Sequence, residues 1–318
     1  GGRSSYDTTW VIQKATGDAP LSRQYVNLLE PYVGTPIVQS VERLAVAGAD
    51  PDARFAPLAF RARMGECTDT VILQHTVGTE LTVDGIVFDG EFGVYRERGG
   101  QFEMAHVTRG TRMLKDGVGV ELSQAQYTGE VIACDYPNST ITIAPAPADV
   151  SALIGRHVRI SNEHGSSASY HIRSAEIIEG GCRLGFDIDP RIGEGFVAEC
   201  SDALMKSATG LRMSGFRYYD GKTLSNEDNS ARYTLTSVSG SVNCSLLAEA
   251  GVDVSAAALQ AAFSDADGDG LTRFLIYDCG PGDTVTIESF ATVARQGHLV
   301  TAGVGGGAQA TVTVEKQE

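Results

Sequence analysis

A loop near the C-terminus has the residue types and spacing of a calcium site. The stretch SDADGDG contains aspartates at alternate positions: Asp265, Asp267 and Asp269. Because Gly270 permits a sharp bend after them, these carboxylates can converge on a hard cation, with the carbonyl of Leu271 as a further ligand. The spacing predicts a structural Ca²⁺ site. The EF-hand loop's final acidic position is occupied by Ile276, so an acidic turn between a helix and a strand is the alternative.

A group of basic residues is a candidate contact for a polyanion. The chain has a formal net charge of -15, so such a ligand needs a local basic site. Basic residues fall close together on what the pattern predicts to be successive strands: Arg96, Arg98, Arg109, Arg112 and Lys115. We take the four arginines as candidate polysaccharide contacts. The alternative is a set of solvated strand residues, which are common on sheet surfaces.

Aromatic residues could add to the same function. Phe216, Tyr218 and Tyr219 lie close together, and tyrosine rings can stack on sugars. We include Tyr218 and Tyr219 among the candidate polysaccharide contacts. Aromatic residues also dominate β cores, so a packing role is the alternative.

Neither histidines nor cysteines have the spacing of a metal pair. His157, His164 and His171 lack the short separations of paired ligands. The six cysteines contain no C-x-x-C pair, which argues against zinc and redox chemistry. We expect free buried thiols, while an even number of cysteines leaves up to three disulfides open.

The elements that must position these residues are strands. The chain has 37 glycines against 10 prolines, together with runs of Val, Ile and Thr, which indicates many tight turns between strands. Asp-Gly pairs at Asp84, Asp89 and Asp220 favour tight hairpin turns. The Ala-rich stretch 255–263 is the single predicted helix. No apolar run is long enough to predict a membrane span.

These patterns predict an all-β protein: an antiparallel β-sandwich with an inserted small β-barrel and one short helix. We expect residues 1–123 to form the first part of the sandwich. Short, turn-bounded strand patterns predict a barrel-like insertion over 124–206. Residues 207–318 are then expected to close the sandwich and to carry the acidic loop.

The stretch YVNLLEPYVGTPIVQSVERL, from Tyr25 to Leu44, predicts a strand over 24–29, a Pro/Gly turn, and a second strand over 37–44. It resembles the C-terminal β-sandwich of heparinase II/III-like polysaccharide lyases, in which a strand F-V-x-V-L-E-P-Y-x-G is followed by I-x-S-V-E-R-L. Three later stretches resemble the same family and occur in family order: VDGIVFDGEFGVYRER from Val83, TGEVIACDYPNSTITI from Thr128, and FSDADGDGLTRFLIYDCGPGDTVTI from Phe263.

The resemblance implies the β portion of a lyase that acts on acidic, uronate-containing polysaccharide by β-elimination. It further implies an N-terminal helical toroid domain of the same gene product as partner, and a secreted, periplasmic or cell-surface location. In the family most catalytic residues lie on the toroid, so we assign no catalytic residue here and expect no cleavage by this chain alone. The alternatives are an extracellular carbohydrate-binding or adhesive module, and a structural or assembly β protein. Because the chain is acidic, we expect no nucleic-acid partner.

Overall fold

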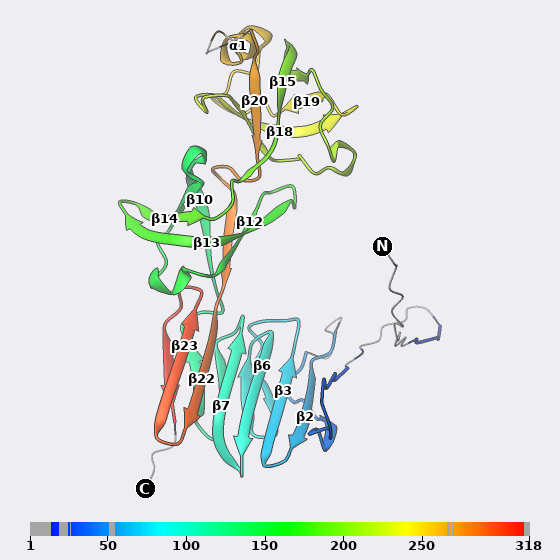
Figure 1. The fold of residues 1–318 in the computed structure, drawn as a ribbon, viewed down its shortest axis with the longest axis vertical. Coiled ribbons are helices and arrows are strands. Elements are labelled where there is room, and N and C mark those ends of the chain that lie inside the picture. The colour runs from blue at the N-terminus through cyan, green and yellow to red at the C-terminus, as the bar shows by residue number, and fades with distance from the viewer. Residues whose placement is uncertain are drawn as a thin grey trace.

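The computed structural model describes residues 14–18, 25, 27–50, 55–265, 268 and 270–314. Strands make up 52% of the chain and helical segments 5%, which confirms the predicted all-β class. Every strand pairing within the described residues is antiparallel. Three β units follow one another along an elongated molecule, with a sandwich at one end and a barrel at the other (Figure 1).

The sandwich consists of two sheets, of seven and five strands. The seven-stranded sheet contains, in spatial order, β1 Ser40–Leu44, β2 Leu58–Met64, β3 Cys67–Leu73, β6 Phe92–Arg98, β7 Gln101–Thr108, β22 Phe290–Gln296 and β23 Leu299–Gly305. The five-stranded sheet contains β24 Ala310–Thr313, β9 Val118–Leu122, β8 Arg112–Lys115, β5 Ile86–Asp89 and β4 Leu81–Val83. The sandwich core includes Phe88, Met113 and Ile72, all fully buried. A Cβ atom at Gly93 would lie 2.5 Å from the Phe88 ring, so a glycine is required there.

The middle barrel, formed by residues 126–186 and 284–288, corresponds to the small barrel predicted over 124–206, but residues 191–206 belong to another unit and β21 comes from the segment expected to close the sandwich. Its closed order is β10 Gln126–Asp135, β11 Thr140–Ala144, β14 Gly181–Phe186, β13 Ser167–Ile178, β12 His157–Ser161 and β21 Thr284–Glu288. Two short 3₁₀ segments belong to it, η1 Tyr136–Asn138 and η2 Ser151–Leu153. Alternate residues such as Val158 and Ile160 point into its core and are buried.

The distal barrel, formed by strands between residues 191 and 277, is a second closed unit. Its order is β15 Arg191–Ser201, β16 Leu204–Ser207, β19 Asn243–Leu246, β18 Arg232–Ser239, β17 Thr223–Asn226 and β20 Arg273–Tyr277. It also contains η3 Ser214–Phe216 and α1 Ala256–Ala262. The helix confirms the prediction over 255–263. Ser255 is its N-cap, since its hydroxyl accepts a hydrogen bond from Ala258 N at 3.3 Å.

The distal barrel corrects the expected division of the chain. Residues 207–277 were expected to close the sandwich, yet β16 to β20 pair with one another and with β15. The sandwich resumes only at β22, after β21 has completed the middle barrel. The distal barrel is therefore inserted into the middle barrel, which is itself inserted into the sandwich. Strand patterns specify alternation along one strand but not the partner strand, so this nesting was not predicted.

The N-terminal stretch also differs from its expected structure. Of the strand predicted over 24–29, residues 24 and 26 lie outside the described residues, and the others have no regular structure. The second strand is confirmed over Ser40–Leu44 only. β1 is the edge strand of its sheet, so a preceding strand would have to extend the sheet beyond β1. Leu29 is instead 85% exposed, which shows that it is not packed in a sheet. The Pro/Gly turn is closed by Glu30, whose carboxylate accepts hydrogen bonds from Ile37 N and Val38 N.

Aromatic and cationic side chains join the two barrels at a neck. We use this name for the linkers 187–190 and 278–283 and the side chains packed on them. The rings of Tyr136 and Tyr277 stack with centroids 3.6 Å apart, and the Arg232 guanidinium lies 4.9 Å from the Tyr136 centroid. The Tyr136 hydroxyl donates to the carbonyl of Cys279 at 2.8 Å. These contacts tie residues of both barrels to one linker.

A buried ion pair lies at the same neck. Lys222 Nζ of the distal barrel is 2.6 Å from Asp278 Oδ1 in the linker, and the Lys222 side chain is 2% exposed. The ammonium also donates to the Asp278 carbonyl at 2.9 Å. Tyr170 of the middle barrel donates to Asp278 Oδ2 at 2.9 Å. The Asp278 carboxylate therefore receives a donor from each barrel.

Asp283, in the same linker, should make stability depend on pH. Burial raises the pKa of Asp283 to about 6, above its ordinary 3.8, although Gly280 N donates to its carboxylate at 2.9 Å. Because the pKa of Asp283 is higher in the folded protein than in the unfolded chain, protonated Asp283 favours the folded state. This contribution is complete below about pH 4 and is lost as the carboxyl ionises through about pH 6. Asp283→Asn keeps an acceptor for Gly280 and stays neutral. Allowing for partial exposure, we expect it to stabilise the protein by about 1–2 kcal/mol at pH 7.

Urea unfolding of both proteins at pH 4 and pH 7 measures this effect. The gain from Asp283→Asn should be present at pH 7 and absent at pH 4. An equal difference at the two pH values would exclude titration of Asp283 as its cause.

Candidate anion-binding cleft

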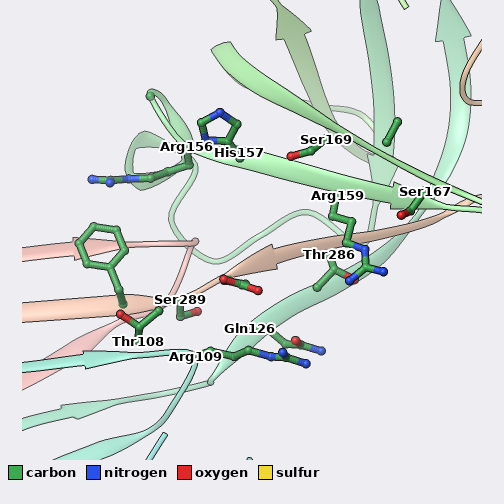
Figure 2. A pocket seen from close by; sticks show the side chains of 14 residues that line it. Thr108, Arg109, Gln126, Arg156, His157, Arg159, Ser167, Ser169, Thr286 and Ser289 are labelled. Carbon is green, nitrogen blue, oxygen red and sulfur yellow. The ribbon is translucent and has the colours of Figure 1, made fainter. Parts of the chain in front are cut away.

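A cleft of about 550 Å³ lies where the sandwich meets the middle barrel. One wall comes from β12 and β13 of the middle barrel, and the other from the residues that follow β7 and precede β22. Arg156 and Arg159 belong to the barrel wall and Arg109 to the sandwich wall. Figure 2 shows Arg109 and Arg159 projecting from these two sides, with Gln126 beside Arg109.

Strand alternation directs Arg159 outward. In the β12 sequence HVRIS, Val158 and Ile160 are buried in the barrel, while His157 and Arg159 are exposed. The register places Arg159 opposite Ser169 of β13 and opposite Thr286 of β21. Residues directly opposite in antiparallel strands share a face, so a hydroxyl-bearing residue lies beside Arg159 on each neighbouring strand. The barrel wall thus presents a cation between two hydroxyl groups.

Arg156 is held at the junction by the sandwich. Its guanidinium lies 4.2 Å from the centroid of the Phe290 ring at the start of β22. Arg156 Nε and Ser289 Oγ are buried without a hydrogen-bond partner among the described residues, and both residues line the cleft. Buried polar groups are normally hydrogen-bonded. The described residues at this junction therefore leave the Arg156 donor and the Ser289 hydroxyl unsatisfied.

The charge of the cleft is opposite to that of the whole chain. Three arginines line it, and among the described residues Glu288 is the one carboxylate that does so. Arg109 donates to Glu91 at 3.1 Å. Within the described part of the chain, neither Arg156 nor Arg159 is paired with a carboxylate. Unpaired guanidinium groups in a cleft favour an anionic ligand.

The cleft has few groups for proton transfer. His157 is the one imidazole among its described lining residues, and no tyrosine lines it there. The His157 ring makes an edge contact with His171, with centroids 5.4 Å apart. β-Elimination needs a base for the proton next to the carboxylate and an acid for the leaving oxygen. Among the described lining residues, His157 and Glu288 are the side chains that could take these roles, beside three arginines and several hydroxyls that suit anion binding.

The structure separates most of the basic residues singled out from the sequence. Arg96 and Arg98 lie on β6 of one sheet, while Arg112 and Lys115 lie on β8 of the other. Arg96 pairs with Asp69, and Arg98 pairs with Glu103. Arg112 pairs with both Glu80 and Glu121, and Lys115 pairs with Glu97. The hydrogen bonds to Asp69 raise the pKa of the Arg96 guanidinium. Of this group, Arg109 is the residue that lines the cleft.

The two candidate tyrosines lie in the distal barrel, away from the cleft. Tyr219 is 3% exposed and belongs to the distal core, and Tyr218 is 37% exposed. Their rings meet edge to face with centroids 5.1 Å apart. Packing in the core therefore explains the position of Tyr219, in agreement with the packing role that was the alternative to sugar stacking.

The acidic loop is described in part. Asp267 and Asp269 lie outside the described residues. The two carboxylate oxygens of Asp265 accept hydrogen bonds from Gly268 N and Gly270 N, each at 2.9 Å. Each carboxylate oxygen retains a lone pair that could bind a cation. The described geometry therefore fits both a Ca²⁺-binding loop and an acidic turn that holds no ion. The Ca²⁺ site, including Leu271, stays a prediction, which the melting temperature with and without a chelator would test.

Arg156 and Arg159 were not singled out from the sequence. The signal for Arg159 was the alternation in HVRIS, which places His157, Arg159 and Ser161 on the outer face of one strand. No local signal marks Arg156, because its position depends on Phe290 of the sandwich.

Comparisons of the chain with protein-family models, with curated proteins and with solved structures found no match.

Among the described residues, no helix has the length and apolar character needed to cross a membrane.

Proposed function

We propose that this chain binds acidic polysaccharide in the cleft between the sandwich and the middle barrel, and does not cleave it. The observation that carries the proposal is the concentration of Arg109, Arg156 and Arg159 around one cleft in a strongly acidic protein. The negative charge elsewhere on the chain would repel a polyanion, so binding would be confined to this local basic site.

The chemistry of the barrel wall suits an acidic sugar. A guanidinium group can donate two parallel hydrogen bonds to a carboxylate. The hydroxyls of Ser169 and Thr286, on either side of Arg159, can exchange hydrogen bonds with sugar hydroxyls. A uronate unit presents both kinds of group, so it matches this cation flanked by hydroxyls better than a neutral sugar does.

We further propose that the chain is the β portion of a heparinase II/III-like lyase, with catalysis supplied by a helical toroid domain of the same gene product outside the cell. The resemblance of four sequence stretches and the all-β fold support this. A cavity of about 700 Å³ on the outer face of the seven-stranded sheet is lined by Leu58, Leu73 and Phe92. Tyr25 lines the same cavity, and a preceding domain could pack against this apolar face.

An extracellular carbohydrate-binding module without a catalytic partner is the alternative. It would use the same cleft, and the sequence encoded upstream of Gly1 distinguishes the two. A helical repeat region there with Tyr, Asn and His would favour the lyase.

Titration of the 318-residue protein with a sulfated uronate polysaccharide, with neutral dextran as control, tests the binding proposal. We expect binding to the acidic polymer alone, weakened by salt because exposed charge interactions are screened. Equal binding to dextran, or none to either polymer, would overturn it. Absorbance of unsaturated uronate should stay constant during incubation, and a rise would show that this chain is itself a lyase.

A further inference from the structure

Lys222 and Asp278 lie opposite each other at the neck, at the ends of two neighbouring strands. Thr223 of β17 is in register with Tyr277 of β20, so Lys222 and Asp278 are the next facing positions beyond this pair. Lys222 Nζ lies 2.6 Å from Asp278 Oδ1 and donates to the Asp278 backbone carbonyl at 2.9 Å. Because a carboxyl C–O bond is about 1.2 Å long, this nitrogen lies within about 4 Å of the carboxyl carbon. The nitrogen is therefore close to the separation from which it can attack that carbon.

Backbone hydrogen bonds fix both residues in this arrangement. Lys222 N donates to the carbonyl of Tyr219 at 3.1 Å, and Leu235 N donates to the Lys222 carbonyl at 2.9 Å. Asp278 N donates to the carbonyl of Pro190 at 3.0 Å. Groups held in a reactive geometry can have effective concentrations of about 10⁵–10⁸ M. Such positioning favours condensation of an amine with a carboxyl group, which is unfavourable between free molecules in water.

Burial distinguishes this pair from the other lysine–carboxylate pair among the described residues. The side chains of Lys222 and Asp278 are 2% and 13% exposed, whereas those of Lys115 and Glu97 in the sandwich are 21% and 20% exposed. Removing two charges from water is costly. Transfer of a proton from the ammonium to the carboxylate removes both charges. It leaves an amine beside a carboxylic acid, which are the two reactants of an amide.

Tyr170 places a hydrogen-bond donor on the second oxygen of the same carboxyl group. Its hydroxyl, from β13 of the middle barrel, donates to Asp278 Oδ2 at 2.9 Å. Burial, together with the Asp278 carboxylate, raises the pKa of the Tyr170 phenol, so this group stays protonated and remains a donor. Attack on the carboxyl carbon would develop negative charge on Oδ2. A donor that is already in place at that oxygen stabilises this charge.

We propose that Lys222 and Asp278 join in an intramolecular isopeptide bond, and that their ion pair is the state that precedes it. A proton moves from the ammonium to Asp278 Oδ1, the neutral amine attacks the carboxyl carbon, and a C–N bond forms. The C–O bond to Oδ1 then breaks. This oxygen leaves as water, with the proton that it already carries and a second one from the nitrogen. The amide keeps Oδ2 as its carbonyl oxygen, and no oxidant or reductant is consumed.

The bond would close residues 222–278 into a covalent loop. This loop contains β17, β18, β19, α1 and β20, so the strand that leaves the distal barrel would be tied to β17 of the same barrel. All six cysteines are free thiols, so disulfides provide no such link. A cross-link that closes a long loop restricts the unfolded chain and raises stability. A protein cut within this loop would remain one covalent piece.

Mass spectrometry of the denatured 318-residue protein, followed by tryptic peptide mapping, tests the proposal. We expect a mass lower than that of the sequence by one water, and a branched peptide that joins Lys222 to Asp278. Lys115 should be recovered unlinked. Lys222→Arg keeps the positive charge but cannot form this bond, so its mass should equal that of its own sequence. Loss of water that persists in Lys222→Arg would show cyclisation elsewhere and would overturn the proposal.

Peptide mapping of the unsubstituted chain keeps the test decisive even if a variant folds poorly, because recovery of Lys222 in an unbranched peptide would also overturn the proposal. Tyr170→Phe tests the chemistry. Removing one donor to a developing oxyanion slows a reaction by about 10²–10³-fold, so this variant should contain mostly unlinked chains soon after synthesis. Tyr95→Phe is the control, since the Tyr95 hydroxyl is also buried but donates to Val118 in the sandwich. Equal linked fractions in the two variants would overturn the role of Tyr170.

Discussion

Replacing Lys222 by methionine is expected to destabilise the protein by about 3–5 kcal/mol, the usual cost of removing one partner of a buried ion pair. Lys222 is 2% exposed, and its ammonium lies 2.6 Å from Asp278 Oδ1. Methionine has a similar length but no charge, so the Asp278 carboxylate would remain mostly buried with the Tyr170 hydroxyl as its remaining side-chain donor. Because Asp278 lies in the linker between the barrels, the loss would act on the neck itself.

Urea unfolding measured by circular dichroism checks this result. Lys206→Met is the matched control, since Lys206 lies on β16 of the same barrel and is exposed. We expect Lys206→Met to change stability by less than about 0.5 kcal/mol. If Lys222→Met were no more destabilising than this control, the ion pair would not be what holds the linker.

Arg159→Ala is expected to weaken binding of a sulfated uronate polysaccharide by about tenfold or more. A hydrogen bond to a charged group is worth about 1.5–3 kcal/mol, and each 1.4 kcal/mol is a factor of about ten in affinity. Arg159 is exposed, has no carboxylate partner within the described part of the chain, and lies between Ser169 and Thr286. Its removal should therefore take away ligand contacts while leaving the barrel core intact.

Arg183→Ala is the control for charge alone. Arg183 is exposed on β14 of the same barrel, outside the cleft, with Glu176 at 3.4 Å. Arg159→Lys separates charge from geometry, because lysine keeps the charge but not the planar fork, and we expect intermediate affinity. Dissociation constants of the three variants, measured at two salt concentrations, test whether the position of Arg159 or the net charge governs binding. Equal losses in Arg159→Ala and Arg183→Ala would mean that net charge, and not the cleft, governs binding.

Local patterns in the sequence determined the secondary structure and part of its organisation. Alternation of apolar and polar residues specified strands such as HVRIS, where Val158 and Ile160 face the core. The Ala-rich stretch after Ser255 specified the helix, because alanine favours helix and serine caps it. These signals depend on residues within a few positions of one another, so they can be recognised without a folded structure.

Tertiary structure alone decided how the strands are partnered and where the cleft lies. Strand β20 closes the distal barrel against β15 and β17, and β21 closes the middle barrel, although the two strands are near neighbours in sequence. The cleft joins Arg109, Arg159 and Phe290 from three distant segments, and the neck joins Lys222 to Asp278. Alternation gives each strand a buried face but does not identify its neighbour, because any strand of matching pattern can offer the same backbone hydrogen bonds.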